Sequence, residues 1–195
     1  MTKFILHGGF TSIPCENNDN YYKEIINSAG NPVKILLVYF AVEKDRWQEI
    51  FENHKELFLE RAGDKKIEFT IASERVDEFI EQIKWCDVMF IRGGLTPVLQ
   101  AQLEKVPNFE DLIKNKIIAG SSAGAMVFSK YYYDQDHDKI FEGMNILHVK
   151  LFTHYLTAGE YAATSGKDKL EKLKAYKEDL PTYAIPETEF LIIEK

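Results

Sequence analysis

Two features of the sequence predict a three-layer α/β/α fold around a mostly parallel central sheet. Short apolar segments alternate along the chain with longer segments whose apolar residues recur at helical spacing. The segment at 34–40, KILLVYF, is apolar on both faces, which is typical of a parallel strand covered by helices. The alternation implies a doubly wound sheet with right-handed crossovers, in which functional sites form outside the carboxyl ends of the strands.

The first half of the chain supplies three strand–helix pairs. Two of the helices end at residues that stop helices, Gly30 with Pro32 in one case and Gly63 in the other. In order, we expect a strand at 3–7, a helix at 20–29, a strand at 34–40, a helix at 44–62, a strand at 66–72 and a helix at 75–85.

Two further strands each end in a glycine-containing turn. The strand at 87–91 runs into RGGLT, after which Pro97 opens a helix that extends to about residue 105. A short helix at 109–115 leads to the strand at 116–120, which runs into GSSAGA and the start of a helix. If these two strands are neighbours in the sheet, both turns face one crevice.

Beyond residue 130 the pattern changes. The segment YYYDQDHDK at 131–139 is aromatic and then acidic, and 143–152 holds short apolar pieces; neither is assigned to a strand or helix. We expect a charged amphipathic helix at 167–178 and two short closing strands at 183–185 and 190–193.

The composition indicates one globular domain at residues 1–195. Of the 195 residues, 45% are hydrophobic and 28% are charged, and the net charge is −7. This acidic balance gives no indication of nucleic acid or a membrane as a partner, and no apolar run approaches the roughly 20 residues of a membrane-spanning helix. Two cysteines far apart and no signal-peptide pattern at the start of the chain favour the cytoplasm.

The turn after the strand at 116–120 has the Gly-x-Ser-x-Gly spacing of a nucleophile elbow, formed by Gly120, Ser122 and Gly124. Such a sharp turn needs small residues on either side and exposes the serine hydroxyl at its apex. Backbone N–H groups at the start of the next helix could stabilise an oxyanion. The same small residues would also let a helix pack closely on a sheet, and the pentapeptide alone does not separate the two interpretations.

A nucleophilic serine needs a base, and the base needs a group that orients it. Of the five histidines, His54 has charged sequence neighbours and is expected on the surface, and His137 is expected in a solvated acidic loop. His7 precedes a Gly-Gly step that resembles the oxyanion loop of some lipases. His148 and His154 flank a short apolar piece, and spacing alone does not choose between them.

Four segments together resemble the peptidase E (aspartyl dipeptidase) and cyanophycinase family of serine peptidases. GSSAGA at 120–125 resembles the family's Gly-x-Ser-Ala-Gly-Ala elbow, and RGGLT at 92–96 resembles its Gly-Gly-Asn-Thr loop. THY at 153–155 resembles the Pro-His-Phe segment with the catalytic histidine, and IPE at 185–187 resembles the Leu-Pro-Glu segment. The resemblance covers about residues 34–194 and implies a class I glutamine amidotransferase-like, flavodoxin-like fold.

The resemblance also implies roles for the matching residues. Ser122 would be the nucleophile, His154 the general base and Glu187 the group that orients His154. The order Ser, His, Glu differs from the order in α/β-hydrolases. Two alternatives stay open: Glu187 is a turn residue between two strands, or an acid in the 134–138 loop (Asp134, Asp136 or Asp138) orients His154 instead.

The implied oxyanion hole combines the backbone N–H of Ala123 with one from Gly93 or Gly94. Glycine suits the second position because the backbone must come close to the substrate carbonyl.

The chain departs from the family pattern at several positions. Leu95 replaces asparagine and Thr153 replaces proline. The aspartyl dipeptidases are thought to bind the substrate's aspartate through an arginine downstream of the histidine, but no arginine follows Arg92 here. Lys167 and Lys169 lie in that region, and lysine is not a fork-shaped bidentate donor. Aspartyl specificity is therefore not implied.

The sequence thus predicts a serine peptidase that cleaves dipeptides or short peptides without a cofactor or a metal. The acidic loop at 134–138 lacks the glycine and glutamate of a calcium loop, and the Gly-Gly steps match no nucleotide-binding motif. An esterase or amidase acting on a non-peptide substrate is one alternative, and a catalytically inactive amidotransferase-like binding module is another. The substrate is not identified, and a homodimer stays open.

Overall fold

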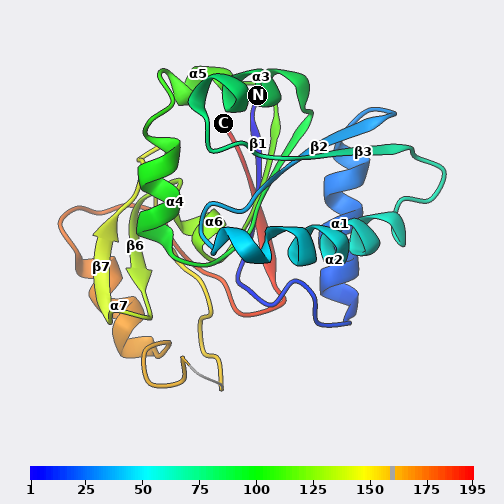
Figure 1. Ribbon diagram of the computed structural model, residues 1–195. Coiled ribbons are helices and arrows are strands. Elements are labelled where there is room, and N and C mark those ends of the chain that lie inside the picture. The colour runs from blue at the N-terminus through cyan, green and yellow to red at the C-terminus, as the bar shows by residue number, and fades with distance from the viewer. Residues whose placement is uncertain (159–160) are drawn as a thin grey trace.

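The centre of the fold is a six-stranded sheet with the strand order β10-β1-β5-β4-β2-β3 (Figure 1). The structure is a computed structural model that describes residues 1–158 and 161–195. Five strands are parallel, and the sixth, β10, pairs antiparallel with β1. Their bounds are β1 Lys3–His7, β2 Val33–Val38, β3 Ile67–Ile71, β4 Val88–Ile91, β5 Ile117–Ser121 and β10 Phe190–Glu194.

Helices cover both faces of this sheet, so the predicted three-layer α/β/α arrangement is confirmed. Right-handed crossovers put α1 and α2 on one face and α3, α4 and α5 on the other, and α1 contacts α2 while α3 contacts α5. The helices are α1 Glu16–Ser28, α2 Trp47–Leu59 after a 3₁₀ turn at Lys44–Arg46, α3 Val76–Trp85, α4 Thr96–Leu103 and α5 Phe109–Leu112. No helix among the described residues has the length and apolar character that a bilayer span requires.

A second, four-stranded sheet was not predicted, and it is built largely from the two segments that the sequence left unassigned. Its order is β7-β6-β8-β9, with β6 and β7 antiparallel and the other pairs parallel. The strands are β6 Ser129–Asp134, β7 Lys139–Glu142, β8 Leu147–Phe152 and β9 Thr182–Ala184. The two expected closing strands are therefore separated: β9 joins this sheet and β10 joins the central one.

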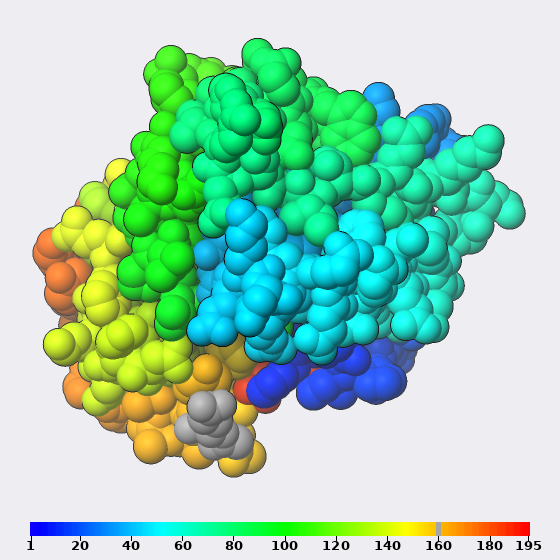
Figure 2. Space-filling view, viewed as in Figure 1, coloured from blue at the N-terminus to red at the C-terminus, as the bar shows by residue number. Residues whose placement is uncertain are grey.

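Helix α7 (Lys167–Ala175) packs on the second sheet and closes a small core of its own. Tyr131, Tyr133, Phe152 and Leu173 form this core. Lys150 is fully buried beneath the helix, and its ammonium donates hydrogen bonds of 2.6 and 2.7 Å to the carbonyl oxygens of residues 174 and 176. A buried lysine thus satisfies carbonyls that the end of a helix leaves unpaired. In the space-filling view, this yellow-to-orange part lies beside the green segment that includes α4 (Figure 2).

Candidate active site

Ser122 occupies the sharp turn between β5 and α6 (Ala123–Met126), with φ 51° and ψ −114°. This conformation lies outside the regions that non-glycine residues favour. Three backbone hydrogen bonds hold it. The Ser122 N–H donates to the His7 carbonyl at 3.0 Å, and the Ser122 carbonyl accepts from the N–H groups of Ala125 and Met126, each at 2.9 Å. The strained turn is therefore fixed by the backbone around it.

The two glycines of the elbow are required by close backbone contacts. A Cβ added to Gly120 would lie 2.1 Å from the Gly124 carbonyl oxygen, and one added to Gly124 would lie 2.3 Å from that of Ile91. The close packing that these small residues allow holds Ser122 in its unusual conformation. The helix that follows is a single turn of four residues, so any oxyanion stabilisation must come from individual N–H groups and not from a long helix dipole.

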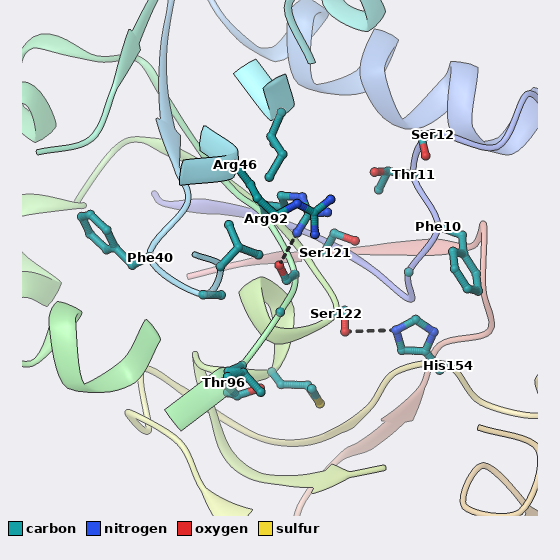
Figure 3. Close-up of a pocket in the computed structure, with 18 of the residues that line it drawn as sticks. Phe10, Thr11, Ser12, Phe40, Arg46, Arg92, Thr96, Ser121, Ser122 and His154 are labelled. Carbon is teal, nitrogen blue, oxygen red and sulfur yellow. Dashed lines mark hydrogen bonds between the residues drawn. The ribbon is translucent and has the colours of Figure 1, made fainter. Parts of the chain in front are cut away.

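His154, which follows β8, lies between Ser122 and Glu187. Its Nε2 is 3.0 Å from Ser122 Oγ (Figure 3), and its Nδ1 is 3.0 Å from Glu187 Oε1. A proton on Nδ1, donated to Glu187, leaves Nε2 as the acceptor for the Ser122 hydroxyl. The His154 residue is 7% exposed. The structure therefore brings the three residues together in the order that base-assisted nucleophilic attack requires.

The other histidines and acids considered from the sequence have different partners. His148 is exposed and bonds to Asn145, and His137 bonds to Asp134 at 2.8 Å. Asp138 forms an ion pair with Lys169 at 2.7 Å. Among the described residues, Glu187 is the acid whose carboxylate reaches His154.

His54 was expected on the surface, and that prediction is wrong. It is 6% exposed and lies on the inner face of α2, where Ile50 and Phe58 are also buried. Residues four apart share a helix face, so the charged residues next to His54 in the sequence point elsewhere. His54 Nδ1 is 2.9 Å from the hydroxyl of Tyr39, and burial lowers the pKa of His54 to about 3.

The Gly8-Gly9 turn after β1 holds the loops that carry His154 and Glu187. A Cβ on Gly9 would lie 2.1 Å from His154 Cε1, and one on Gly8 would lie 1.9 Å from the Pro186 carbonyl oxygen. The His154 N–H donates to the Gly8 carbonyl at 2.9 Å, and the Thr188 N–H donates to the Gly9 carbonyl at 3.0 Å. The turn thus packs against His154 and joins its loop to that of Glu187.

His7 and Asn18 hold this turn and the residues after it through hydrogen bonds. The Gly9 N–H donates to His7 Nδ1 at 3.0 Å, which makes His7 Nε2 the donor to Asn18 Oδ1 at 2.8 Å. The Asn18 amide donates in turn to the carbonyl oxygens of Phe10 and Ile13 at 2.8 and 2.7 Å. Burial lowers the pKa of His7 to about 4, although the bond to Asn18 partly opposes this. His7 is therefore neutral at neutral pH, as its acceptor role requires.

Ser122 and His154 open into a cleft of about 790 Å³ at the carboxyl ends of β1, β2, β4 and β5. Strands β4 and β5 are neighbours, as the shared crevice requires, so Gly93 lies beside Ser122. A Cβ on Gly93 would be 3.0 Å from Ser122 Cβ, whereas one on Gly94 would be 2.3 Å from the Ala41 carbonyl oxygen. Gly93 therefore faces the serine, and Gly94 packs on the loop after β2.

The sequence did not single out two arginines that also line this cleft, Arg46 and Arg92 (Figure 3). Lys167 and Lys169, which lie in the region of the family's aspartate-binding arginine, do not line it. The sequence could have pointed to Arg92 by its position, because it follows the carboxyl end of a central strand, where sites of parallel sheets form. Across residues 1–158 and 161–195, no group of His, Cys, Asp or Glu side chains is suited to hold a metal ion.

Comparisons with known proteins bear on the whole chain. The model of peptidase family S51 matches residues 4–195. A crystal structure of a peptidase from an acI-B1 Actinobacterium is 22% identical, with a TM-score of 0.66, over 98% of this chain and 83% of that one. A Listeria monocytogenes EGD-e protein provisionally called peptidase E is 19% identical, with a TM-score of 0.69, over 99% and 94%. At these identities the two structures bear on the fold alone, and no curated protein sequence matches the chain.

The contact between Gly9 and His154 predicts that Gly9→Ala impairs the site. The added methyl group would displace the imidazole from Ser122, and a displacement of about 1 Å can cost on the order of 100-fold in rate. We therefore expect labelling of Ser122 by a fluorophosphonate to slow by about that factor, measured by intact mass over time. Gly63→Ala is the control: Gly63 has φ +57° but no atom within 4 Å of the added Cβ, so it should unfold more easily yet label normally. Equal labelling of both variants would contradict the role of the turn.

The lowered pKa of His7 predicts that acid destabilises the fold. Between the unfolded value of 6.5 and the folded value of about 4, the unfolded chain binds a proton that the folded one does not. This contribution to stability is present above pH 6.5 and is lost as the pH falls toward 4, amounting to about 2 kcal/mol at about pH 5. Urea unfolding at about pH 7.5 and about pH 5 should show a pH dependence that is smaller by that amount in His7→Gln. The exposed His148→Gln variant should keep the full dependence, and an unchanged dependence in His7→Gln would refute the assignment.

Proposed function

The chain belongs to peptidase family S51 and is a serine-type peptidase, and on that premise we propose that it hydrolyses peptide bonds in dipeptides or short peptides through Ser122, His154 and Glu187. The observation that carries the proposal is the pair of 3.0 Å contacts that His154 makes, one with the Ser122 hydroxyl and one with the Glu187 carboxylate. Membership of the family also agrees with the resemblance in the four sequence segments.

In the proposed reaction, Ser122 Oγ attacks the scissile carbonyl while His154 Nε2 takes the hydroxyl proton. Glu187 keeps the proton on His154 Nδ1 and stabilises the imidazolium that forms. His154 then gives its proton to the leaving amine, so the peptide C–N bond breaks and an ester links the acyl group to Ser122. Water, deprotonated by the same imidazole, hydrolyses that ester and restores the serine.

The oxyanion hole is proposed to use the N–H groups of Gly93 and Ala123. Ala123 is the first residue of α6, and the first N–H groups of a helix have no acceptor within it. Gly93 comes from the neighbouring strand end and faces Ser122. Two donors fixed by backbone stabilise the developing charge without reorganising, and each such donor typically contributes about 3–4 kcal/mol to the transition state.

The proposal favours small substrates because the cleft is bounded by loops from both sheets. Residues from the turns after β1, β2, β4 and β6 all line its 790 Å³, a volume that falls within the range of small-molecule sites. The two cysteines are both unpaired, and we place the activity in the cytoplasm as part of the proposal. The proposal includes a homodimer, which a measurement of the oligomeric state in solution tests.

The first test is covalent labelling of Ser122. A fluorophosphonate should add once to the wild-type protein, peptide mapping should place the adduct on Ser122, and Ser122→Ala should stay unlabelled. Ser121→Ala, which removes the adjacent hydroxyl, is the matched control and should still be labelled. Hydrolysis of dipeptides by the labelling-competent protein would then separate a peptidase from an esterase. Absence of an adduct at high probe concentration would support an inactive binding module instead.

The second test concerns Glu187. Glu187→Gln keeps the size of the side chain but removes the charge that stabilises the His154 imidazolium, so we expect kcat to fall by about 10²–10⁴-fold with little change in KM. Glu189→Gln is the matched control on the same loop, since Glu189 is exposed and bonds to Asn17. A kcat that falls equally in both variants, or in neither, would count against the triad.

A further inference from the structure

Two of the chain's four arginines form no ion pair with a carboxylate of residues 1–158 and 161–195, and both line the cleft that holds Ser122. Arg61 pairs with Asp19 and Glu60, and Arg75 pairs with Asp77 and Glu78. Among the described residues, no such ion pair involves Arg46 or Arg92, and these are the two that line the cleft with Ser122. Four carboxylates, Glu43, Glu49, Asp134 and Asp136, also line the cleft, but none of them forms an ion pair with Arg46 or Arg92 among the described contacts.

The positive charge of Arg46 acts unfavourably on the guanidinium of Arg92. Arg92 is partly buried, and burial, followed by the charge of Arg46, lowers the pKa of its guanidinium. Tyr39 and Glu49 oppose that shift, but Glu49 forms no ion pair with either guanidinium among the described contacts. Placing two cations together without a bound anion costs free energy that an anion between them would offset.

The backbone adds to the positive field at the same place. Arg46 is the residue that precedes α2, a helix of 13 residues, so its backbone stands at the positive end of that helix. In the close-up, Arg46 and Arg92 lie next to each other, and Ser122 lies between them and His154 (Figure 3). A ligand that reaches Ser122 from this end of the cleft therefore meets both guanidinium groups.

We propose that Arg46 and Arg92 form a subsite that binds a carboxylate of the peptide substrate. A guanidinium presents parallel N–H donors that match a carboxylate in a bidentate arrangement. Arg92 also donates to the carbonyl of Gly93, so the subsite and the proposed oxyanion donor share one loop. The inference rests on the proposed peptidase function. The carboxylate has two sources in a short peptide, the free C-terminus or an acidic side chain, and both present the same group.

A binding measurement tests the subsite without requiring turnover. Isothermal titration calorimetry of the full chain should detect succinate but not succinamide, which has the same shape without the charges. Arg46→Gln and Arg92→Gln should each weaken succinate binding by about ten-fold or more, since a hydrogen bond to a charged group is lost. Arg75→Gln, an arginine already paired outside the cleft, should bind succinate as the wild type does. Equal binding by Arg46→Gln, or no succinate binding to the wild type, would overturn the subsite.

Hydrolysis then identifies the source of the carboxylate. Ala-Ala compared with Ala-Ala-amide reports on the free C-terminus, and Asp-Ala-amide compared with Asn-Ala-amide reports on an acidic side chain. We expect a preference of about ten-fold or more in kcat/KM within one pair, and loss of that preference in Arg46→Gln. Arg46 is the cleaner variant, because Arg92 also contacts Gly93. No preference in either pair would overturn the substrate role of the arginines.

The two proposals fail in different ways. A wild-type protein that binds succinate through Arg46 but does not label at Ser122 would retain the subsite and lose the peptidase mechanism. A protein that labels at Ser122 and hydrolyses dipeptides without regard to carboxylates would retain the mechanism and lose the subsite.

Discussion

The close approach of the Gly8-Gly9 turn to the loops of His154 and Glu187 is the contact on which the rest of the site depends. Ser122 follows a strand of the central sheet, whereas His154 follows a strand of the second sheet, so the nucleophile and its base come from different sheets. Backbone hydrogen bonds join the two sheets here. Residues 154 and 188 donate to the turn, and Gly8 donates to the carbonyl of Glu189 at 2.9 Å. Because a Cβ at either glycine would collide with its neighbours, the approach is possible only with glycine at both positions.

This contact also explains why strained backbone persists at the site. Ser122 has φ 51° and His154 has φ 50°, and such conformations cost on the order of 1–3 kcal/mol each in a non-glycine residue. Both residues are held by backbone hydrogen bonds from other elements, so the surrounding fold sustains the strain. The result is a serine and an imidazole whose separation is set by the backbone and not by flexible side chains. Such preorganisation is what a nucleophile–base pair needs before substrate binds.

The sequence could predict the central sheet because its inner parallel strands are largely apolar on both faces and its longer helices carry an apolar stripe. It could predict the elbow because small residues at this spacing allow a sharp strand-to-helix turn. It could not predict the second sheet, because the tyrosines and charges of β6 and β7 show neither the helical spacing nor the alternation of a strand clearly. His54 was misplaced because its sequence neighbours were weighed instead of Ile50 and Phe58, the residues four positions away. Arg46 carried no local signal at all, since its position in the cleft depends on how the loop after β2 folds.

Charge at the cleft follows from local geometry and not from the chain's total. The net charge of −7 would disfavour an anionic substrate at long range, yet exposed charges more than about 8 Å apart are largely screened at physiological salt. Two guanidinium groups line the cleft beside the carboxylates of Glu43, Glu49, Asp134 and Asp136, and Arg92 is partly withdrawn from water, where screening is weakest. No arginine follows Arg92 in the chain, so a guanidinium in this cleft must come from the first half of the chain. The loops after β2 and β4 supply Arg46 and Arg92, and both loops lie at the edge where parallel sheets bind their ligands.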